Sequence, residues 1–372
     1  MKKFLPFLMI LSLMLSLTAC GTAQSGSEPE STAQSPEESS AQAAPEAPEQ
    51  DNSWQFDSPE NHQMDPEVFE ALHQALPGSG IHTMVTVKDG VIIDEYYGDG
   101  YDENSLFELY SASKSFTGAL IGIAIDEGYI GGVDDRVSDY LPEVLEQEDT
   151  RKHDLTLRHL LTQTSGLEWY EWGSGYSNWT EFRSADNWVD YILSRALIHD
   201  PGTVFNYSTG NTHLLSAVLQ SATGMTQEEY CRTRLFDPMG ISEEAYWNTD
   251  PQGIADGGNG LVITSRDAAR FGQLCLNGGT WNGQQLVPAD CVEESTSRQN
   301  GGPGDATGAF GSYATPYPAS SFDTYFSFGH AGQFIYVVPE LQLVTVITSS
   351  CQSSYTPRAY FTDYVLNAYM GA

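Results

Sequence analysis

Strand-like segments stand near both ends of the folded part of this chain, and helical patterns fill the length between them. Near the start, HTMVTVK and VIIDEYY are joined by Asp89-Gly90, a pair typical of a tight hairpin because both central residues of a type I′ turn need positive φ. Near the end, residues 333–338 and 342–348 form a second strand-like pair around Pro339-Glu340. A sheet must therefore be assembled from two distant parts of the chain.

Helical patterns stand before, between and after these strands. We expect an N-terminal helix over residues 65–76, started by Asp65-Pro66, and a last amphipathic helix from about 357 to 370. Residues 133–300 are mostly helical, with patterns such as TLRHLLTQTSGL, SADNWVDYILSRAL, NTHLLSAVLQSATG and SRDAARFGQLCLNGG. The patterns predict an α+β fold in which a helical subdomain, roughly 133–300, is inserted into the sheet.

The first fifty residues differ in composition from the rest. Two lysines, an apolar run and the segment LTAC, which ends in Cys20, resemble a bacterial lipobox and predict cleavage before Cys20 and lipidation of that residue. An ordinary signal peptide with an incidental cysteine is the alternative. Residues 21–51 contain no aromatic residue and no cation, so they cannot bury enough apolar surface to offset their ordering entropy. The predicted division is a signal peptide at 1–19, a lipidated cysteine and disordered acidic tether at 20–53, and one folded domain at 54–372.

The charge and the cysteine and histidine spacings exclude several classes of partner. A formal net charge of −34 argues against nucleic acid, because phosphate binding needs clustered Lys and Arg. It also disfavours adsorption to anionic lipid, so the lipid on Cys20 is the only membrane link we expect. No histidine pair has metal-ligand spacing, and we expect no metal and no cofactor. Four further cysteines leave open one or two disulfides or buried free thiols: Cys231, Cys275, Cys291 and Cys351.

One helix of the folded part carries an unusual lysine. In LYSASKSFTGALIGIAIDEG, residues 109–128, Lys114 stands in the first turn of a helix that is otherwise apolar. Ser111 stands three residues earlier, so the two side chains lie on one face within hydrogen-bonding reach. An unactivated hydroxyl is a poor nucleophile, and an amine that takes its proton would explain a lysine held inside. A solvated lysine near a helix start is the alternative that this stretch alone leaves open.

Two later motifs favour the catalytic interpretation. Tyr207-Ser208-Thr209 stands in a loop directly before a helix, and FGHAGQF places His330-Ala331-Gly332 directly before a strand. We expect the helix, the loop and the edge strand to form three walls of one cleft.

In this order the motifs resemble the serine β-lactamase and penicillin-binding-protein superfamily. The similarity is greatest to its class C-like branch, which includes family VIII esterases, D-aminopeptidases and 6-aminohexanoate-dimer hydrolases. It covers nearly all of residues 80–350 and includes LTLRHLLTQTSGL, LFDPMGI and GNGLVITSRDAARFGQL. The resemblance implies a β-lactamase/transpeptidase-like α+β fold, with an antiparallel sheet flanked by helices.

The resemblance also implies roles for single residues. Ser111 would be the acylated nucleophile, Lys114 its proton acceptor or electrostatic partner, and Tyr207 the general base or acid that serves the leaving group. Lys114 would be the cation that lowers the pKa of the phenol. The backbone N–H groups of Ser111 and Gln333 would form the oxyanion hole, and Gly332 would let the strand approach the substrate closely.

Two departures from the class C pattern bear on the substrate. Thr209 stands where class C enzymes carry asparagine, and His330 stands where they carry a lysine that helps to hold the substrate carboxylate. A neutral histidine in an acidic protein is a weaker clamp for an anion. We therefore expect esters, amides or peptides without an essential carboxylate. Trp169 and Tyr170, in an aromatic loop, are candidate lid residues over an acyl group, with structural packing as the alternative.

Together these observations predict an extracytoplasmic serine hydrolase that acts on a small-molecule or peptide substrate. The lipid on Cys20 would hold it at the outer face of the cytoplasmic membrane, or at a periplasmic face if there is an outer membrane. A β-lactamase or D-Ala carboxypeptidase is one alternative. The other is a penicillin-binding or sensor module that does not hydrolyse its ligand.

Overall fold

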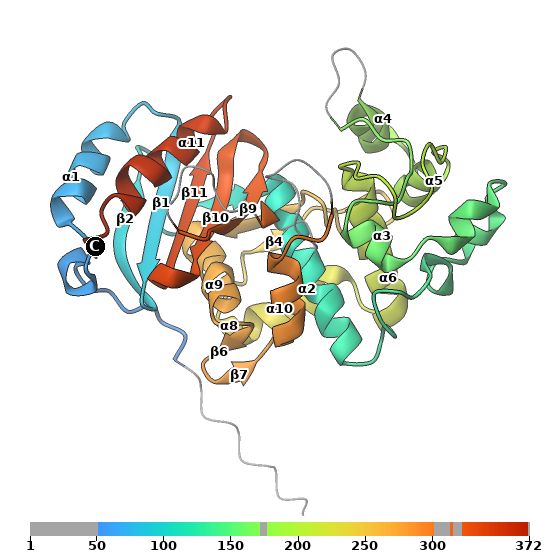
Figure 1. The fold of residues 1–372 in the computed structure, drawn as a ribbon, viewed down its shortest axis with the longest axis horizontal. Coiled ribbons are helices and arrows are strands. Elements are labelled where there is room, and N and C mark those ends of the chain that lie inside the picture. Colours follow the sequence, from blue (N-terminus) through green and yellow to red (C-terminus); the bar gives the residue numbers. More distant parts are fainter. Residues whose placement is uncertain (1–50, 172–176, 301–312, 315–321, 371–372) are drawn as a thin grey trace, which may run out of the picture. The chain divides into compact units, whose positions relative to one another are not determined.

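A six-stranded antiparallel sheet joins the two ends of the folded part (Figure 1). The computed structural model describes residues 51–171, 177–300, 313–314 and 322–370, so Cys20, the predicted signal peptide and most of the tether lie outside the described residues. The strand order is β2-β1-β11-β10-β9-β8. The strands are β1 (Ile81–Lys88), β2 (Val91–Tyr97), β8 (Tyr313–Ala314), β9 (Tyr325–Gly329), β10 (Gln333–Val338) and β11 (Leu343–Ser349). The predicted α+β class, with a sheet built from both ends, is confirmed.

The hairpin between β1 and β2 has the predicted turn. Asp89 and Gly90 have φ values of 54° and 83°, as a type I′ turn requires. On its other side β1 pairs with β11, where Val85 lies opposite Val346. The first and last described strands of the chain, β1 and β11, therefore lie side by side inside the sheet.

Helices cover both faces of this sheet (Figure 1). On one face, α1 (Pro66–Ala75) and α11 (Tyr355–Tyr360), which continues as a π-helix over Phe361–Leu366, pack with alternate strand residues such as Met84 and Tyr336. On the other face, α9 (Ser265–Leu276) contacts β1, β10 and β11. The sequence placed α9 in the inserted helical subdomain, whereas the structure places it in the layer that supports the sheet.

Gly272 sets how closely α9 approaches the strands. A Cβ at this position would lie 2.5 Å from a methyl of Val344 and 2.9 Å from a methyl of Ile335. In an exposed helix, Gly→Ala gains about 1 kcal/mol of helix propensity. Here the overlap outweighs that gain, so we expect Gly272→Ala to lower the free energy of unfolding by about 1–3 kcal/mol. The change in the free energy of unfolding can be measured by urea unfolding, provided that the m-values of the two proteins are equal. A variant more stable than the wild type would contradict the close contact.

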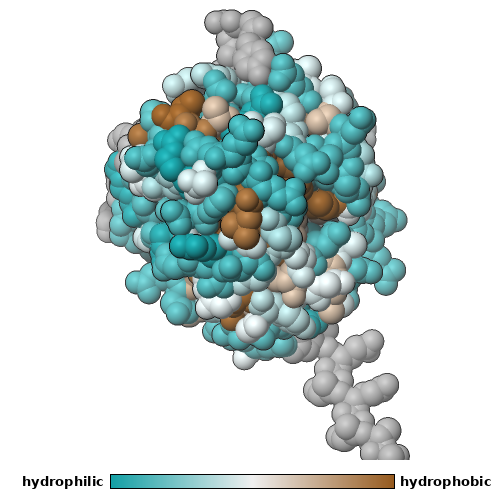
Figure 2. Space-filling view, turned by 90° about the vertical axis from the view of Figure 1, so that its right-hand side faces the viewer, coloured by the Kyte–Doolittle hydropathy of each residue, from teal (hydrophilic) through white to brown (hydrophobic). Residues whose placement is uncertain are grey.

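The remaining described helices are α2 (Ser113–Asp126), α3 (Leu157–Leu161), α4 (Asn178–Ser184), α5 (Trp188–Leu193), α6 (Thr209–Thr223), α7 (Gln227–Cys231), α8 (Asp237–Met239) and α10 (Ala289–Thr296). Of these, α3, α4, α5 and α6 form the inserted part on the right of Figure 1, whereas α8 and α10 lie near α9. Short 3-10 or π turns occur at Pro59–His62, Val137–Asp139, Pro142–Glu146, Thr150–Asp154, Arg232–Phe236 and Pro339–Leu341. Helix α6 packs against α2, α3 and α5. The outer face of this part is mostly hydrophilic, with separate small apolar groups (Figure 2).

Two small sheets contain strands from residues 133–300, the segment that the sequence predicts as mostly helical. One has the order β3-β5-β4, from Leu106–Glu108, Leu261–Thr264 and Tyr246–Trp247. The other pairs β6 (Thr280–Trp281) with β7 (Gln284–Gln285). The first sheet continues into the start of α2, because the N–H of Leu109 donates to the carbonyl of Leu261 at 2.8 Å. It thereby positions residues 258–260 beside that helix.

The contacts of the folded part begin two residues before the predicted boundary at 54. The Asn52 amide donates to the carbonyl of Pro238 at 3.2 Å and accepts from the Trp281 indole at 2.8 Å. Within the described ranges, every helix is too short or too polar to span a bilayer.

Candidate active site

The candidate nucleophile lies where the small sheet turns into α2. Ser111 is in a single 3-10 turn, Tyr110–Ala112, directly before the helix, and its side chain is 7% exposed. Tyr110 has a φ of 48°, which is unusual for a residue with a Cβ. Ser111 lines two openings, whereas the residues that follow it, from Ala112 to Ala124, are buried. Strained backbone of this kind is common where a functional side chain must be held in one place.

Lys114 is held inside, as one of the two interpretations of the sequence predicted. It is 1% exposed, and its Nζ lies 3.0 Å from Ser111 Oγ, 3.2 Å from Thr209 Oγ1 and 2.8 Å from the carbonyl oxygen of Gly258. Burial lowers the pKa of Lys114 to about 8, although Glu171 and Asp256 act in the opposite direction. The amine is therefore neutral in a substantial fraction of molecules at mildly alkaline pH.

The tyrosine motif lies across the cleft from α2. Ser208 is the N-cap of α6 and accepts a hydrogen bond from the N–H of Asn211 at 3.3 Å. This cap places Thr209 in the first turn, facing Lys114, and leaves Tyr207 in the preceding loop. Lys114 Nζ lies 5.0 Å from the centre of the Tyr207 ring. The structure thus brings serine, lysine and tyrosine from two separate parts of the chain to one place.

The third wall is the turn between β9 and β10. Gly329 packs so tightly on the backbone that a Cβ there would lie 2.0 Å from the carbonyl oxygen of Leu109. The Gln333 side chain is buried, and its amide donates to the Ser349 carbonyl at 2.7 Å, so the role predicted for this residue can rest only on its backbone N–H. Gly332 has a φ of 89°, and a Cβ there would meet Ser349 and Pro357. Glycine is therefore required by conformation and packing at this position.

Two openings meet at Ser111 and His330. One, of about 220 Å³, is also lined by Tyr207, Phe328, Ala331, Cys351, Gln352 and Ser354. The other, of about 210 Å³, is also lined by Tyr110, Glu171, Trp179 and Asn259. His330 is exposed and its ring contacts that of Tyr110 at 5.4 Å. Among these described lining residues there is no lysine or arginine that could hold a substrate carboxylate.

The aromatic loop differs from the predicted lid. Trp169 is 2% exposed and packs in the core against Phe182 and Tyr191, and Tyr170 is 47% exposed and lines neither opening. Trp169 is therefore a packing residue, which was the alternative given for it, and not part of a lid. The aromatic residue that does line the cleft is Trp179, at the start of α4. Residues 172–176 of this loop lie outside the described residues.

Three residues of the site were not predicted from the sequence. Gly258 and Asn259 belong to the loop before β5: the Gly258 carbonyl accepts from Lys114, and the Ser111 hydroxyl donates to Asn259 Oδ1 at 3.4 Å. Glu171 accepts a hydrogen bond from the hydroxyl of Thr209. The GNGL motif marked the first two only as part of a family resemblance, and no pattern marked Glu171.

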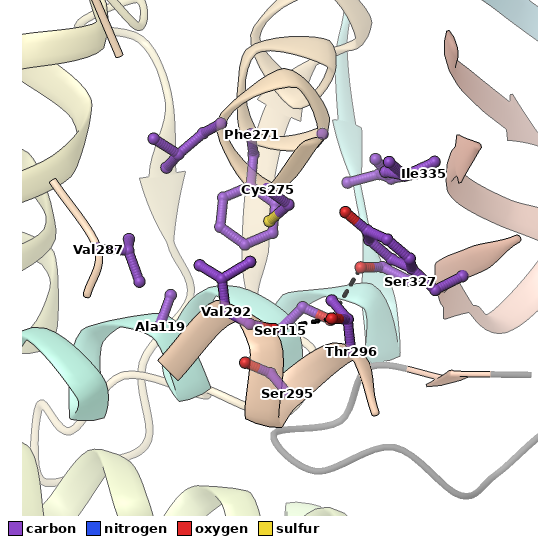
Figure 3. A pocket seen from close by; sticks show the side chains of 14 residues that line it. Ser115, Ala119, Phe271, Cys275, Val287, Val292, Ser295, Thr296, Ser327 and Ile335 are labelled. Carbon is purple, nitrogen blue, oxygen red and sulfur yellow. Dashed lines mark hydrogen bonds between the residues drawn. The ribbon is translucent and has the colours of Figure 1, made fainter. Parts of the chain in front are cut away.

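A third cavity lies between α2, α9, α10 and the sheet, and it results from the packing of these elements (Figure 3). It has about 30 Å³, room for one or two waters, and its walls are mostly apolar, with Phe271 and Ile335 among them. Ser327 on β9 donates to Ser115 on α2 at 2.8 Å across it. Burial raises the pKa of the Cys275 thiol in its wall to about 12, so this thiol is unreactive. The cavity lacks a nucleophile and base pair, and its serine bond fixes α2 against the sheet.

The described part of the chain has four free cysteines: Cys231, Cys275, Cys291 and Cys351. The sequence left open disulfides or free thiols for these four cysteines, and in the structure all four are free thiols. Within the described ranges, no cluster of three or more His, Cys, Asp or Glu side chains is placed to hold a metal ion.

Comparison with known proteins gives a family match over most of the chain. The model of the Beta-lactamase family matches residues 68–369. The 6-aminohexanoate-dimer hydrolase of Paenarthrobacter ureafaciens is 27% identical over 60% of this chain and 58% of its own length. Penicillin-binding protein 4* of Bacillus subtilis is 33% identical over 49% of this chain and 41% of its own length. The matched regions thus span about half the length of these curated relatives.

The fold has a solved counterpart with a hydrolase description. The structure described as "EstCE1, a hydrolase with promiscuous acyltransferase activity" aligns with a TM-score of 0.67, covering 82% of this chain and 98% of its own, at 18% identity. At that identity the likeness supports the fold alone. The predicted superfamily is confirmed by the family match, and the predicted hydrolase class agrees with the names of the relatives.

Proposed function

The chain belongs to the Beta-lactamase family, and from this premise we propose that it is a serine hydrolase that cleaves an ester or amide bond through an acyl-enzyme on Ser111. One observation carries the proposal: the Ser111 hydroxyl lies 3.0 Å from a buried amine, at the meeting point of two openings. A nucleophile and its base within hydrogen-bonding distance in a cleft are the minimum that acyl transfer needs.

The steps follow from the positions of these groups. Ser111 Oγ attacks the carbonyl carbon, and its proton passes to Lys114. The backbone N–H groups of Ser111 and Gln333 hold the oxyanion, where one such donor typically contributes about 3 kcal/mol to lowering the barrier. Tyr207 gives its phenolic proton to the leaving oxygen or nitrogen as the C–O or C–N bond breaks, which leaves a phenolate beside the protonated Lys114. Water then attacks the ester on Ser111 and gives a proton to the phenolate, and the Ser111 oxygen takes its proton back from Lys114 as the acyl bond breaks.

The composition of the cleft favours acyl groups without an essential carboxylate. The described residues that line it include the Glu171 carboxylate and the His330 imidazole, and Lys114 is buried against Ser111. A substrate carboxylate would meet a carboxylate and an exposed imidazole, and no lysine or arginine among the described lining residues. We extend the proposal to the predicted location, with a lipid on Cys20 holding the enzyme at the outer face of the cytoplasmic membrane.

Labelling with a fluorophosphonate tests the proposal, because this probe phosphonylates activated serines. We expect stoichiometric labelling of the wild type and complete loss in Ser111→Ala. Ser165→Ala is the matched control, since Ser165 is a buried turn serine whose Oγ accepts from the N–H of Leu167; it should label like the wild type. Labelling that persists in Ser111→Ala would overturn the proposal.

A substrate panel separates the alternatives. We expect turnover of p-nitrophenyl esters and linear amides to exceed that of nitrocefin and D-alanyl peptides. Faster nitrocefin turnover would favour a β-lactamase, in line with the relatives of the penicillin-binding type. A stable adduct in the intact mass, without turnover of any substrate, would favour a sensor.

A further inference from the structure

The Glu171 carboxylate is joined to the candidate base through a single hydroxyl. One carboxylate oxygen accepts the hydroxyl proton of Thr209, and the other accepts from the Thr209 N–H at 3.0 Å and from the indole N–H of Trp169. Thr209 is fully buried, and its Oγ1 lies 3.2 Å from Lys114 Nζ. A chain of hydrogen bonds therefore runs from Glu171 through Thr209 to Lys114.

The Glu171 carboxylate determines which group donates and which accepts in each of these hydrogen bonds. A threonine hydroxyl has one proton and can point it at either neighbour, whereas a carboxylate can only accept. The proton of Thr209 must therefore point at Glu171, and its oxygen must accept a proton from Lys114.

The three hydrogen-bonding neighbours of Lys114 determine where the lone pair of its neutral amine points. A neutral amine has two N–H donors and one lone pair. The Gly258 carbonyl, 2.8 Å away, can only accept and takes one donor, and the Thr209 oxygen takes the second. The lone pair is left for the third neighbour, Ser111 Oγ, at 3.0 Å. The amine is thereby oriented to take the proton of the nucleophile.

We propose that Glu171 is a positioning residue that, by fixing the Thr209 hydroxyl, directs the lone pair of Lys114 toward Ser111. The inference rests on the proposed function, in which Lys114 accepts the proton of Ser111. The inference also gives a physical reason for threonine in the third position of the tyrosine motif. The Thr209 hydroxyl can accept from Lys114 in a fixed orientation because its own proton is held by the Glu171 carboxylate.

Electrostatics give the same residue a second, separable effect. The charged or titratable groups that face Lys114 are Glu171, Asp256 and Tyr207. Burial lowers the pKa of Lys114, and the Glu171 carboxylate partly opposes this shift. Removing the carboxylate charge therefore lowers the pKa of Lys114 further and leaves more neutral amine at neutral pH. On charge alone, the loss of Glu171 would speed acylation at neutral pH, whereas loss of direction slows it at every pH.

Glu171→Gln separates the two effects. The N–H groups of Thr209 and Trp169 both need an acceptor, so the new amide turns its oxygen toward them and its NH₂ toward Thr209 Oγ1. The hydroxyl then turns its proton to Lys114 and occupies the lone pair. We expect the second-order rate of fluorophosphonate labelling to fall tenfold or more at pH 9, and the midpoint of its rise with pH to move to lower pH.

Two comparison variants make the test specific. Thr209→Val removes the hydroxyl, so adding Glu171→Gln to it should change the rate less than about threefold. Glu168→Gln alters a carboxylate in the same loop that contacts Tyr170 and none of the site residues named above, and it should label like the wild type with the same pH midpoint.

Each outcome bears on one claim. An unchanged labelling rate and midpoint in Glu171→Gln, while Ser111 of the wild type is labelled, would overturn this inference alone. An equal loss with and without the Thr209 hydroxyl, with a lowered melting temperature, would reduce Glu171 to a structural role and overturn it too. Absence of Ser111 labelling in the wild type would instead reject the proposed function.

Discussion

Replacing Lys114 with methionine should lower the rate of Ser111 acylation by 10³-fold or more while leaving the cleft intact. Methionine has nearly the length of lysine and fits a buried site, so the packing of α2 is kept. What is lost is the amine that lies 3.0 Å from the candidate nucleophile, and positioned general bases contribute typically 10²–10⁴-fold. The rate of p-nitrophenol release and the rate of fluorophosphonate labelling both measure the loss.

Lys152→Met is the matched control, because Lys152 is also buried and its Nζ donates to the Leu193 carbonyl at 2.6 Å, away from the cleft. It makes the same chemical change and should leave acylation within about threefold of the wild type. A comparable loss in both variants would mean that any buried lysine supports the fold. In that case Lys114 would have no special role in the chemistry.

The same variant has a signature in stability against pH. The pKa of Lys114 is about 8 in the folded chain, against an ordinary value of 10.5. Between these two values the Lys114 side chain binds more protons in the unfolded chain, so the contribution of Lys114 to stability should rise with pH across this window, by about 3 kcal/mol. Lys114→Met lacks this rise, so the stability difference between the two proteins should shift toward the wild type from pH 8 to 10.5.

The parts of the fold that the sequence predicted are those with strong local signals. Asp89-Gly90 specifies its turn because few residue pairs accept two positive φ values, and both do so in the structure. Asp65 starts α1 one residue before its first helical position, where its side chain accepts from the N–H of Glu67. Predicting that Lys114 is buried also required the distant motifs at residues 207–209 and 330–332, because the helix pattern alone was equally compatible with a solvated lysine.

The parts that were missed depend on contacts between distant segments. Strands β3, β4 and β5 have two to four residues each, too few for an alternating pattern to emerge. Glu171 gains its place only because the loop after α3 returns to the start of α6, and Trp169 is buried by the same path. The sequence around Glu171 does not show that its carboxylate contacts Thr209, which stands 38 residues later. The sequence around Trp169 likewise does not show that its ring is buried.

Tyr207→Phe should separate the two halves of the proposed reaction. The change keeps the ring, whose centre lies 5.0 Å from Lys114 Nζ, and removes only the hydroxyl of a residue that lines the same opening as Ser111. In our mechanism this hydroxyl passes the proton to the leaving group. An amide leaves as an amine that must be protonated, whereas p-nitrophenolate leaves without a proton. We therefore expect kcat/KM to fall by 10²-fold or more for an amide, and much less for acylation by a p-nitrophenyl ester.

The ratio of these two losses is the decisive quantity, because misfolding or a distorted cleft would lower both rates together. Tyr110→Phe serves as the control, since Tyr110 lines the neighbouring opening and its ring contacts His330; it should lower both rates equally and by less than about threefold. If Tyr207→Phe also lowers both substrates by one factor, the phenol acts before the leaving group departs. Tyr207 would then be the base for Ser111, and Lys114 would act on it only as a fixed charge.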